Sequence, residues 1–82
     1  MPLKYWTGQE IMKGDRVLFH LQPAVIELVA TDPNNPEQRW YVEEDGGGVL
    51  VRGPGDGQPT FIPADQLDEY EDLEFVARAN AQ

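Results

Sequence analysis

Glycine and proline divide this chain into short segments, which leaves little room for long helices or long strands. The 82 residues include 8 glycines and 7 prolines, placed between short runs of Val, Ile, Leu and Phe. Short apolar runs bounded by such residues are typical of β-strands joined by turns. We therefore predict a small all-β protein that forms a single domain over residues 1–82.

The apolar runs predict six strands and one helical turn. In 16–21 the apolar residues Val17, Phe19 and Leu21 occupy every second position, the pattern of a half-buried strand. The segment 24–31 suits a central strand buried on much of both sides, with a helix as the rival interpretation. Pro63 suits the first position of a helical turn. Strands are expected at 16–21, 24–31, 39–43, 48–52, 60–62 and 73–78, with a 3₁₀ or α turn at 63–67 and a frayed tail at 79–82.

Inward positions of these strands define an expected core. The expected core residues are Val17, Phe19, Ile26, Leu28, Val42, Val49, Val51, Phe61, Ile62, Leu67, Leu73 and Phe75. A chain this small is expected to bury one of its two tryptophans. Trp6 is interpreted as a cover over one end of a barrel and Trp40 as the surface candidate, with the opposite assignment left open.

The composition excludes several classes of protein. The chain has no cysteine, which excludes disulfides, thiolate metal sites and a cysteine nucleophile. With 15 acidic and 6 basic residues its formal charge is −9, which argues against nucleic-acid binding. No apolar run approaches the roughly 20 residues of a membrane span. The first residues lack the apolar region of a signal peptide, so a cytoplasmic protein is expected.

Candidate catalytic and metal-binding groups are few. His20 is the only histidine and is interpreted as an ordinary surface residue. The segment 53–59 is rich in glycine but lacks the Lys-Ser/Thr of a phosphate loop. Asp65, Asp68 and Glu69 have helical spacing, yet they do not match the ligand pattern of a calcium loop. The sequence therefore predicts no enzyme, no catalytic residue, no metal and no cofactor.

Charge placement is the most informative functional feature. Residues 43–45 are three consecutive acids, and 65–74 contains six acids and no basic residue. These nine acids equal the whole net charge. Solubility is the simpler interpretation, and a surface for a basic partner protein is the sharper one. The candidate partner-binding residues are Trp40, Tyr41, Glu43, Glu44, Asp45, Asp65, Asp68, Glu69, Tyr70, Glu71 and Asp72.

Three stretches resemble the SH3-like barrel group. Residues 9–17 (QEIMKGDRV) resemble the stretch in which an acidic and an apolar residue precede a turn ending in Gly-Asp. Residues 39–42 (RWYV) resemble an aromatic pair, and 61–67 (FIPADQL) resemble the strand, proline and 3₁₀ turn before the last strand. The resemblance covers roughly residues 9–78. It implies a small SH3-like barrel of five to six short strands with one 3₁₀ turn before the last strand.

Departures from SH3 domains direct the functional expectation. Only eight residues precede Gln9, and the tyrosine expected after the proline turn is replaced by Gln66 or Leu67. The chain is more similar to small bacterial SH3-like barrels, several of which are accessory or immunity proteins. We expect a non-enzymatic, immunity-type inhibitor that binds a basic toxin or another cationic protein. The alternative is an SH3-like adaptor or regulatory domain that binds a peptide or a larger complex.

Overall fold

The structure, a computed structural model, describes residues 3–53 and 58–79 and consists mostly of one antiparallel β-sheet. Five strands lie in the order β4-β3-β2-β1-β5. An α-helix connects β2 to β3, and a 3₁₀ helix connects β4 to β5. The elements are β1 (Arg16–Phe19), β2 (Gln22–Ala30), α1 (Pro36–Asp45), β3 (Gly48–Arg52), β4 (Thr60–Pro63), η1 (Ala64–Glu69) and β5 (Leu73–Ala77).

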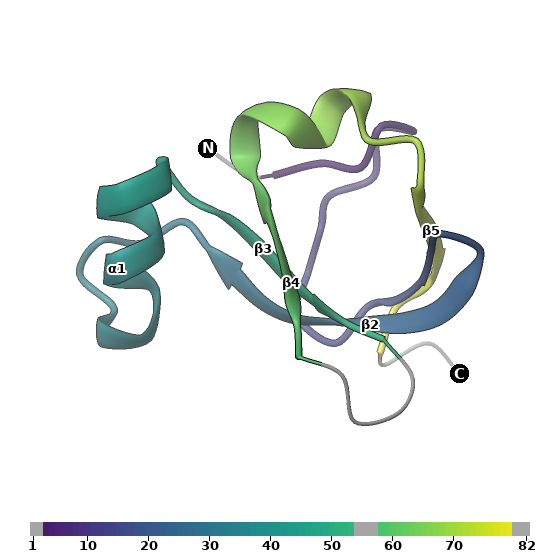
Figure 1. The fold of residues 1–82 in the computed structure, drawn as a ribbon, viewed down its shortest axis with the longest axis horizontal. Helices are drawn as coiled ribbons and strands as arrows, with labels where there is room; N and C mark the ends of the chain where they lie inside the picture. The colour runs from purple at the N-terminus through teal and green to yellow at the C-terminus, as the bar shows by residue number, and fades with distance from the viewer. Residues whose placement is uncertain (1–2, 54–57, 80–82) are drawn as a thin grey trace.

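The sheet is strongly curved, and the helices lie in different places around it. Figure 1 shows β5 on the right, η1 across the top and α1 set apart on the left. The predicted small, mainly β fold and the 3₁₀ turn before the last strand are thus confirmed. The sheet ends at β4 on one side and β5 on the other.

The segment 39–43, predicted as a strand, is instead part of helix α1. The side chain of Asn35 accepts a hydrogen bond from the amide of Glu37 at 2.9 Å, which caps the helix start, and Pro36 occupies the first turn. The helix is terminated by Gly46, which lies in the left-handed region at φ 76°. Backbone N–H groups at this end donate hydrogen bonds to the carbonyl oxygens of Tyr41 and Val42. The aromatic residues suggested a strand, but the local capping residues stabilise a helix.

A two-residue turn joins β1 to β2. The predicted strand 16–21 stops at Phe19, because His20 and Leu21 adopt positive φ values of 51° and 68°. Positive φ at both central residues is what a type I′ hairpin turn requires. Phe19 pairs with Gln22 across it. The second strand therefore begins at Gln22, two residues earlier than predicted, and ends at Ala30.

The core lies inside the curved sheet, under η1. Of the expected core residues, seven are buried: Val17, Ile26, Val49, Val51, Ile62, Leu67 and Leu73. Phe19 and Phe75 are half-buried and pack against this cluster. Leu28, Val42 and Phe61 are only half-buried and lie outside it. Four buried residues were not expected in the core: Tyr5, Ile11, Ala24 and Ala30.

A buried carboxylate attaches the N-terminal segment to the sheet. Asp15 is 1% exposed and is the one buried charged residue in the described part of the chain. Its Oδ2 accepts hydrogen bonds from the Tyr5 hydroxyl at 2.6 Å, the Met12 amide at 2.9 Å and Arg78 Nη1 at 2.8 Å. Asp15 therefore links the segment before β1 to the residue after β5, and we call this group the Asp15 junction.

Candidate partner-binding surface

Helix α1 is mostly exposed. None of its residues is buried, and four of its ten residues are acidic against one that is basic. A helix usually owes its stability to an apolar face packed on the core. In this helix only Gln38, Tyr41 and Val42 are half-buried, so it contributes little to the interior and presents most of its side chains to the outside.

The helical conformation places Trp40 among acids. Glu43 and Glu44 follow it at i+3 and i+4, and Glu37 precedes it at i−3, so all three neighbour Trp40 on the helix surface. In the predicted strand, Trp40 and Glu43 would have pointed to opposite faces. Trp40 is 62% exposed. The structure thus brings an aromatic side chain and an acidic rim together on one helix, and we call these four residues the acidic helix face.

Tyr41 attaches the helix to the sheet. Its ring stacks on Phe61 of β4, with centroids 5.0 Å apart and an interplanar angle of 19°. Trp40 meets the Tyr41 ring edge-on at 5.1 Å and 88°. Both geometries are favourable for aromatic pairs. Tyr41, which is predicted to contact a partner, is half-buried and packs against both Phe61 and Trp40.

An acidic hollow continues this surface beyond the end of α1. Asp45 lines it together with Asp65 and Asp68 of η1, and its volume is about 740 Å³. The Ala64 amide donates to the Gly47 carbonyl at 2.9 Å, which holds the start of η1 beside the end of α1. Lys4 also lines the hollow. The two acidic clusters, twenty residues apart in the sequence, therefore meet here.

The remaining predicted residues lie at another corner. The ring of Tyr70 stacks with that of Phe19, with centroids 6.0 Å apart, and its hydroxyl lies 3.4 Å from His20 Nε2. Asp72 Oδ2 lies 3.3 Å from His20 Nδ1. Tyr70 packs against the core cluster rather than standing free. The exposed Glu69 and Glu71 lie on either side of Tyr70 in the chain. The predicted site therefore divides into two regions.

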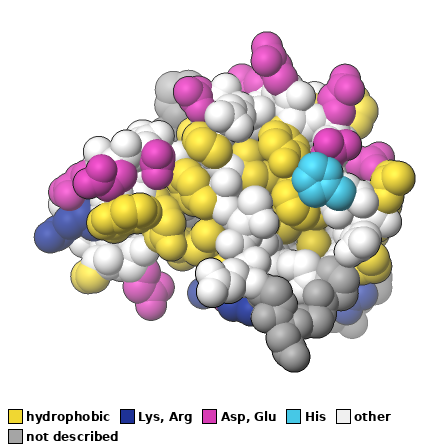
Figure 2. All heavy atoms as spheres, in the orientation of Figure 1, with side chains coloured by type: hydrophobic (Ala, Val, Ile, Leu, Met, Phe, Trp, Pro, Cys, Tyr) yellow, Lys and Arg dark blue, Asp and Glu magenta, His cyan; other side chains and the backbone are white. Residues whose placement is uncertain are grey.

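The surface view agrees with this division. Figure 2 shows acidic side chains around α1 on the left and along the upper edge, with hydrophobic side chains between them and near His20. The three ion pairs of the described residues involve none of the acids of α1, Asp65 or Asp68. Within the described part of the chain, no ion pair neutralises their negative charge.

The expectation that one tryptophan would be buried is wrong. Trp6 is 42% exposed, and Trp40 is more exposed still. The apolar interior that a tryptophan was expected to fill is filled by Tyr5 and Ile11, both 2% exposed. Trp40 therefore lies at the surface as expected, and so does Trp6.

The described residues offer no arrangement of three or more His, Asp or Glu side chains that could hold a metal ion. Likewise, none of the described helices has the length and apolar character needed to cross a membrane. We compared the chain with protein-family models, curated proteins and solved structures, and none of the three comparisons produced a match. The function of the protein must therefore be inferred from the geometry of its surface.

Proposed function

We propose that this protein is a non-enzymatic binding module that recognises a basic protein through the acidic helix face and the acidic hollow. One observation carries the proposal: α1 buries none of its residues yet presents Trp40 with three neighbouring acids. An exposed tryptophan is a common hot spot in protein interfaces, and an acidic rim steers a basic partner into place.

The immunity-type role is the specific form of this proposal. An inhibitor that neutralises a basic toxin benefits from fast association, and a concentrated negative field raises the association rate. The net charge of −9 and the unpaired acids around Trp40 supply such a field. The partner is proposed to place arginine or lysine side chains against Glu43 and Glu44 and in the hollow beside Asp65 and Asp68.

The SH3-like architecture belongs to the same proposal. The strand order β4-β3-β2-β1-β5 and the 3₁₀ helix between the last two strands support it. In this interpretation α1 is an insertion between the second and third strands. An SH3-like adaptor that binds a peptide remains the second candidate, and the aromatic group of Trp40, Tyr41 and Phe61 favours it.

An affinity capture from the native host tests the proposal. The bait is the full chain at low and at moderate salt, because attraction between exposed charges weakens as ionic strength rises. A basic protein retained by the wild type and lost with Glu43→Lys/Glu44→Lys supports it. The matched control is Glu10→Lys/Glu71→Lys, which changes the net charge equally at exposed acids outside α1 and the hollow. Equal loss with the control pair, or an acidic partner, contradicts the proposal.

A further inference from the structure

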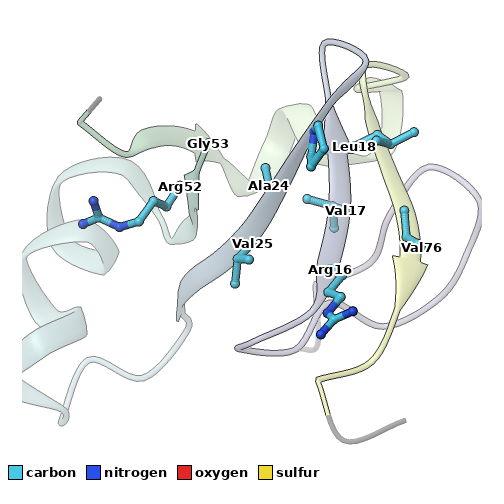
Figure 3. A pocket seen from close by; sticks show the side chains of 9 residues that line it. Arg16, Val17, Leu18, Ala24, Val25, Arg52, Gly53 and Val76 are labelled. Atoms are coloured by element: carbon cyan, nitrogen blue, oxygen red, sulfur yellow. The ribbon is translucent and has the colours of Figure 1, made fainter. Parts of the chain in front are cut away.

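A second hollow lies on the outer face of the sheet, over β1, β2, the end of β3 and β5. Its volume is about 500 Å³, within the ~300–1,000 Å³ range of small-molecule sites. Arg16 and Leu18 face it, since they alternate along β1 with the buried Val17. Figure 3 shows Val25 between Arg16 and Arg52, with Val76 on the neighbouring strand. We call this hollow the arginine groove; the lining residues used below are Arg16, Leu18, Pro23, Val25, Arg52 and Val76.

The floor of the arginine groove is aliphatic and exposed. Val25 of β2 and Val76 of β5 are 44% and 55% exposed. Leu18 and Pro23 pair across β1 and β2 and extend the same apolar surface. Covering these side chains would be favourable by about 25 cal/mol for each Å² of apolar area removed from water. The floor therefore favours an aliphatic ligand.

The arginine side chains at the rim of the groove indicate the charge of that ligand. Arg52 Nη2 lies 2.7 Å from Glu27 Oε1, so the Glu27 carboxylate already neutralises its guanidinium and its aliphatic stem serves as a wall. Arg16 takes part in none of the ion pairs found among the described residues. A guanidinium beside an apolar surface is well suited to a carboxylate, which it can bind through two parallel hydrogen bonds.

We propose that the arginine groove binds a free aliphatic carboxylate, with the alkyl chain on Val25 and Val76 and the carboxylate at Arg16. The attraction between Arg16 and the carboxylate is local, and it acts against the field of the whole protein, whose net charge is −9. No residue of α1 lines this groove. This inference therefore does not depend on the proposed function, and each can fail alone.

The test is a titration of the isotope-labelled full chain with octanoate, followed by the NMR signals of its backbone amides. The matched probe is octylammonium, which has the same alkyl chain and the opposite charge. The overall field favours the cation. Saturable shifts of the amides of Leu18, Val25 and Val76 with octanoate, and weaker or absent shifts with octylammonium, therefore require the local arginine. Octanoate is expected to bind in the millimolar range, because the groove is shallow and open.

Two variants locate the carboxylate. Arg16→Met keeps the aliphatic stem and is expected to weaken octanoate binding by up to about fivefold, the upper end of the range for a solvent-accessible ion pair. Arg39→Met removes the same charge from α1, outside the groove, and should leave the affinity unchanged. Thermal unfolding by circular dichroism checks that both variants are folded.

Several results would overturn the inference. These are the absence of saturable shifts, equal shifts with octylammonium, or equal weakening by Arg16→Met and Arg39→Met. Shifts of the same amides on dilution of the protein alone would assign the groove to a second copy of the chain and would overturn it as well.

Discussion

The Asp15 junction and the acidic helix face use the same side-chain chemistry in opposite ways. At the junction one carboxylate is buried and receives hydrogen bonds from Tyr5, Met12 and Arg78. On α1 four carboxylates are exposed and none joins an ion pair of the described residues. Buried charge must be paired to be tolerated, whereas exposed charge costs little and acts at a distance. The contrast predicts that the first acid serves stability and agrees with the recognition role proposed for the second group.

The largest expected effect is on stability, from Asp15→Ala. The variant leaves the buried Tyr5 hydroxyl without an acceptor and removes the ion pair with Arg78. Loss of one partner of a buried pair typically lowers the free energy of unfolding by about 3 kcal/mol or more. Urea unfolding measures the change, with Glu44→Ala as the exposed-acid control. If the two variants differ by less than about 1 kcal/mol, the contrast between buried and exposed acids is wrong.

The next effect is on binding, from Trp40→Ala. If Trp40 is a hot spot, its removal weakens the complex with the basic partner by about 2 kcal/mol, mainly through faster dissociation. The free energy of unfolding should change little, because Trp40 is mostly exposed. Surface plasmon resonance with the captured partner measures both rate constants. A variant that unfolds more easily but binds normally would show that Trp40 contributes to stability and not to binding.

The stability of the protein at alkaline pH tests the role of the Asp15 junction. Burial, followed by the hydrogen bond to Asp15, raises the pKa of Tyr5 well above its ordinary value of 10.0. The unfolded chain loses this proton near pH 10 and the folded chain does not, so the stabilisation is complete below that pH and is lost as pH rises. The free energy of unfolding should fall by about 1.4 kcal/mol per pH unit there. Urea unfolding between about pH 9 and 11 should show a smaller fall for Tyr5→Phe; an equal fall would show that other groups cause it.

A smaller effect is expected at the β1–β2 turn, where the change is stabilising. Leu21 has a φ of 68° and is 80% exposed, so its side chain gains no burial in exchange for a conformation that disfavours it. Leu21→Gly should raise the free energy of unfolding by about 1 kcal/mol by relieving left-handed strain. Thermal melts measure this, and binding through α1 should not change. A destabilised Leu21→Gly variant would mean that the Leu21 side chain makes a contact worth more than the strain.

The smallest effect on stability is expected from reversing two exposed acids. Glu44→Lys with Asp68→Lys should alter the free energy of unfolding by only about 0.5 kcal/mol for each site. It should slow association with the basic partner and reduce the dependence of that rate on salt. Stopped-flow association at several ionic strengths measures both. An unchanged salt slope would show that the acids of α1 and the hollow do not steer the partner.

Several features of the fold could be read directly from the sequence. The short runs around Val17, Val49 and Ile62 are strands because alternating apolar side chains, bounded by turn residues, allow few other packings. The 3₁₀ helix follows Pro63 as expected. The signals for α1 were also present, in Asn35, Pro36 and Gly46, but the aromatic pair was given more weight.

Other features depend on contacts between residues distant in the sequence. The burial of Asp15 requires Tyr5 and Arg78, which are 10 and 63 residues away. The meeting of Asp45 with Asp65 and Asp68 requires η1 to fold back onto the end of α1. The arginine groove combines side chains from four strands, β1, β2, β3 and β5. No local pattern encodes such meetings.

The class of fold, the positions of most strands and the concentration of negative charge could thus be predicted from the chain alone. Those properties follow from local periodicity, turn chemistry and counting. The burial of Asp15, the shared helix face of Trp40 with Glu43 and Glu44, and the division of the predicted acidic site between the hollow and the corner at His20 became apparent only in the folded molecule. The physical reason is that burial and surface neighbourhood depend on how the whole sheet curves and on what packs against it.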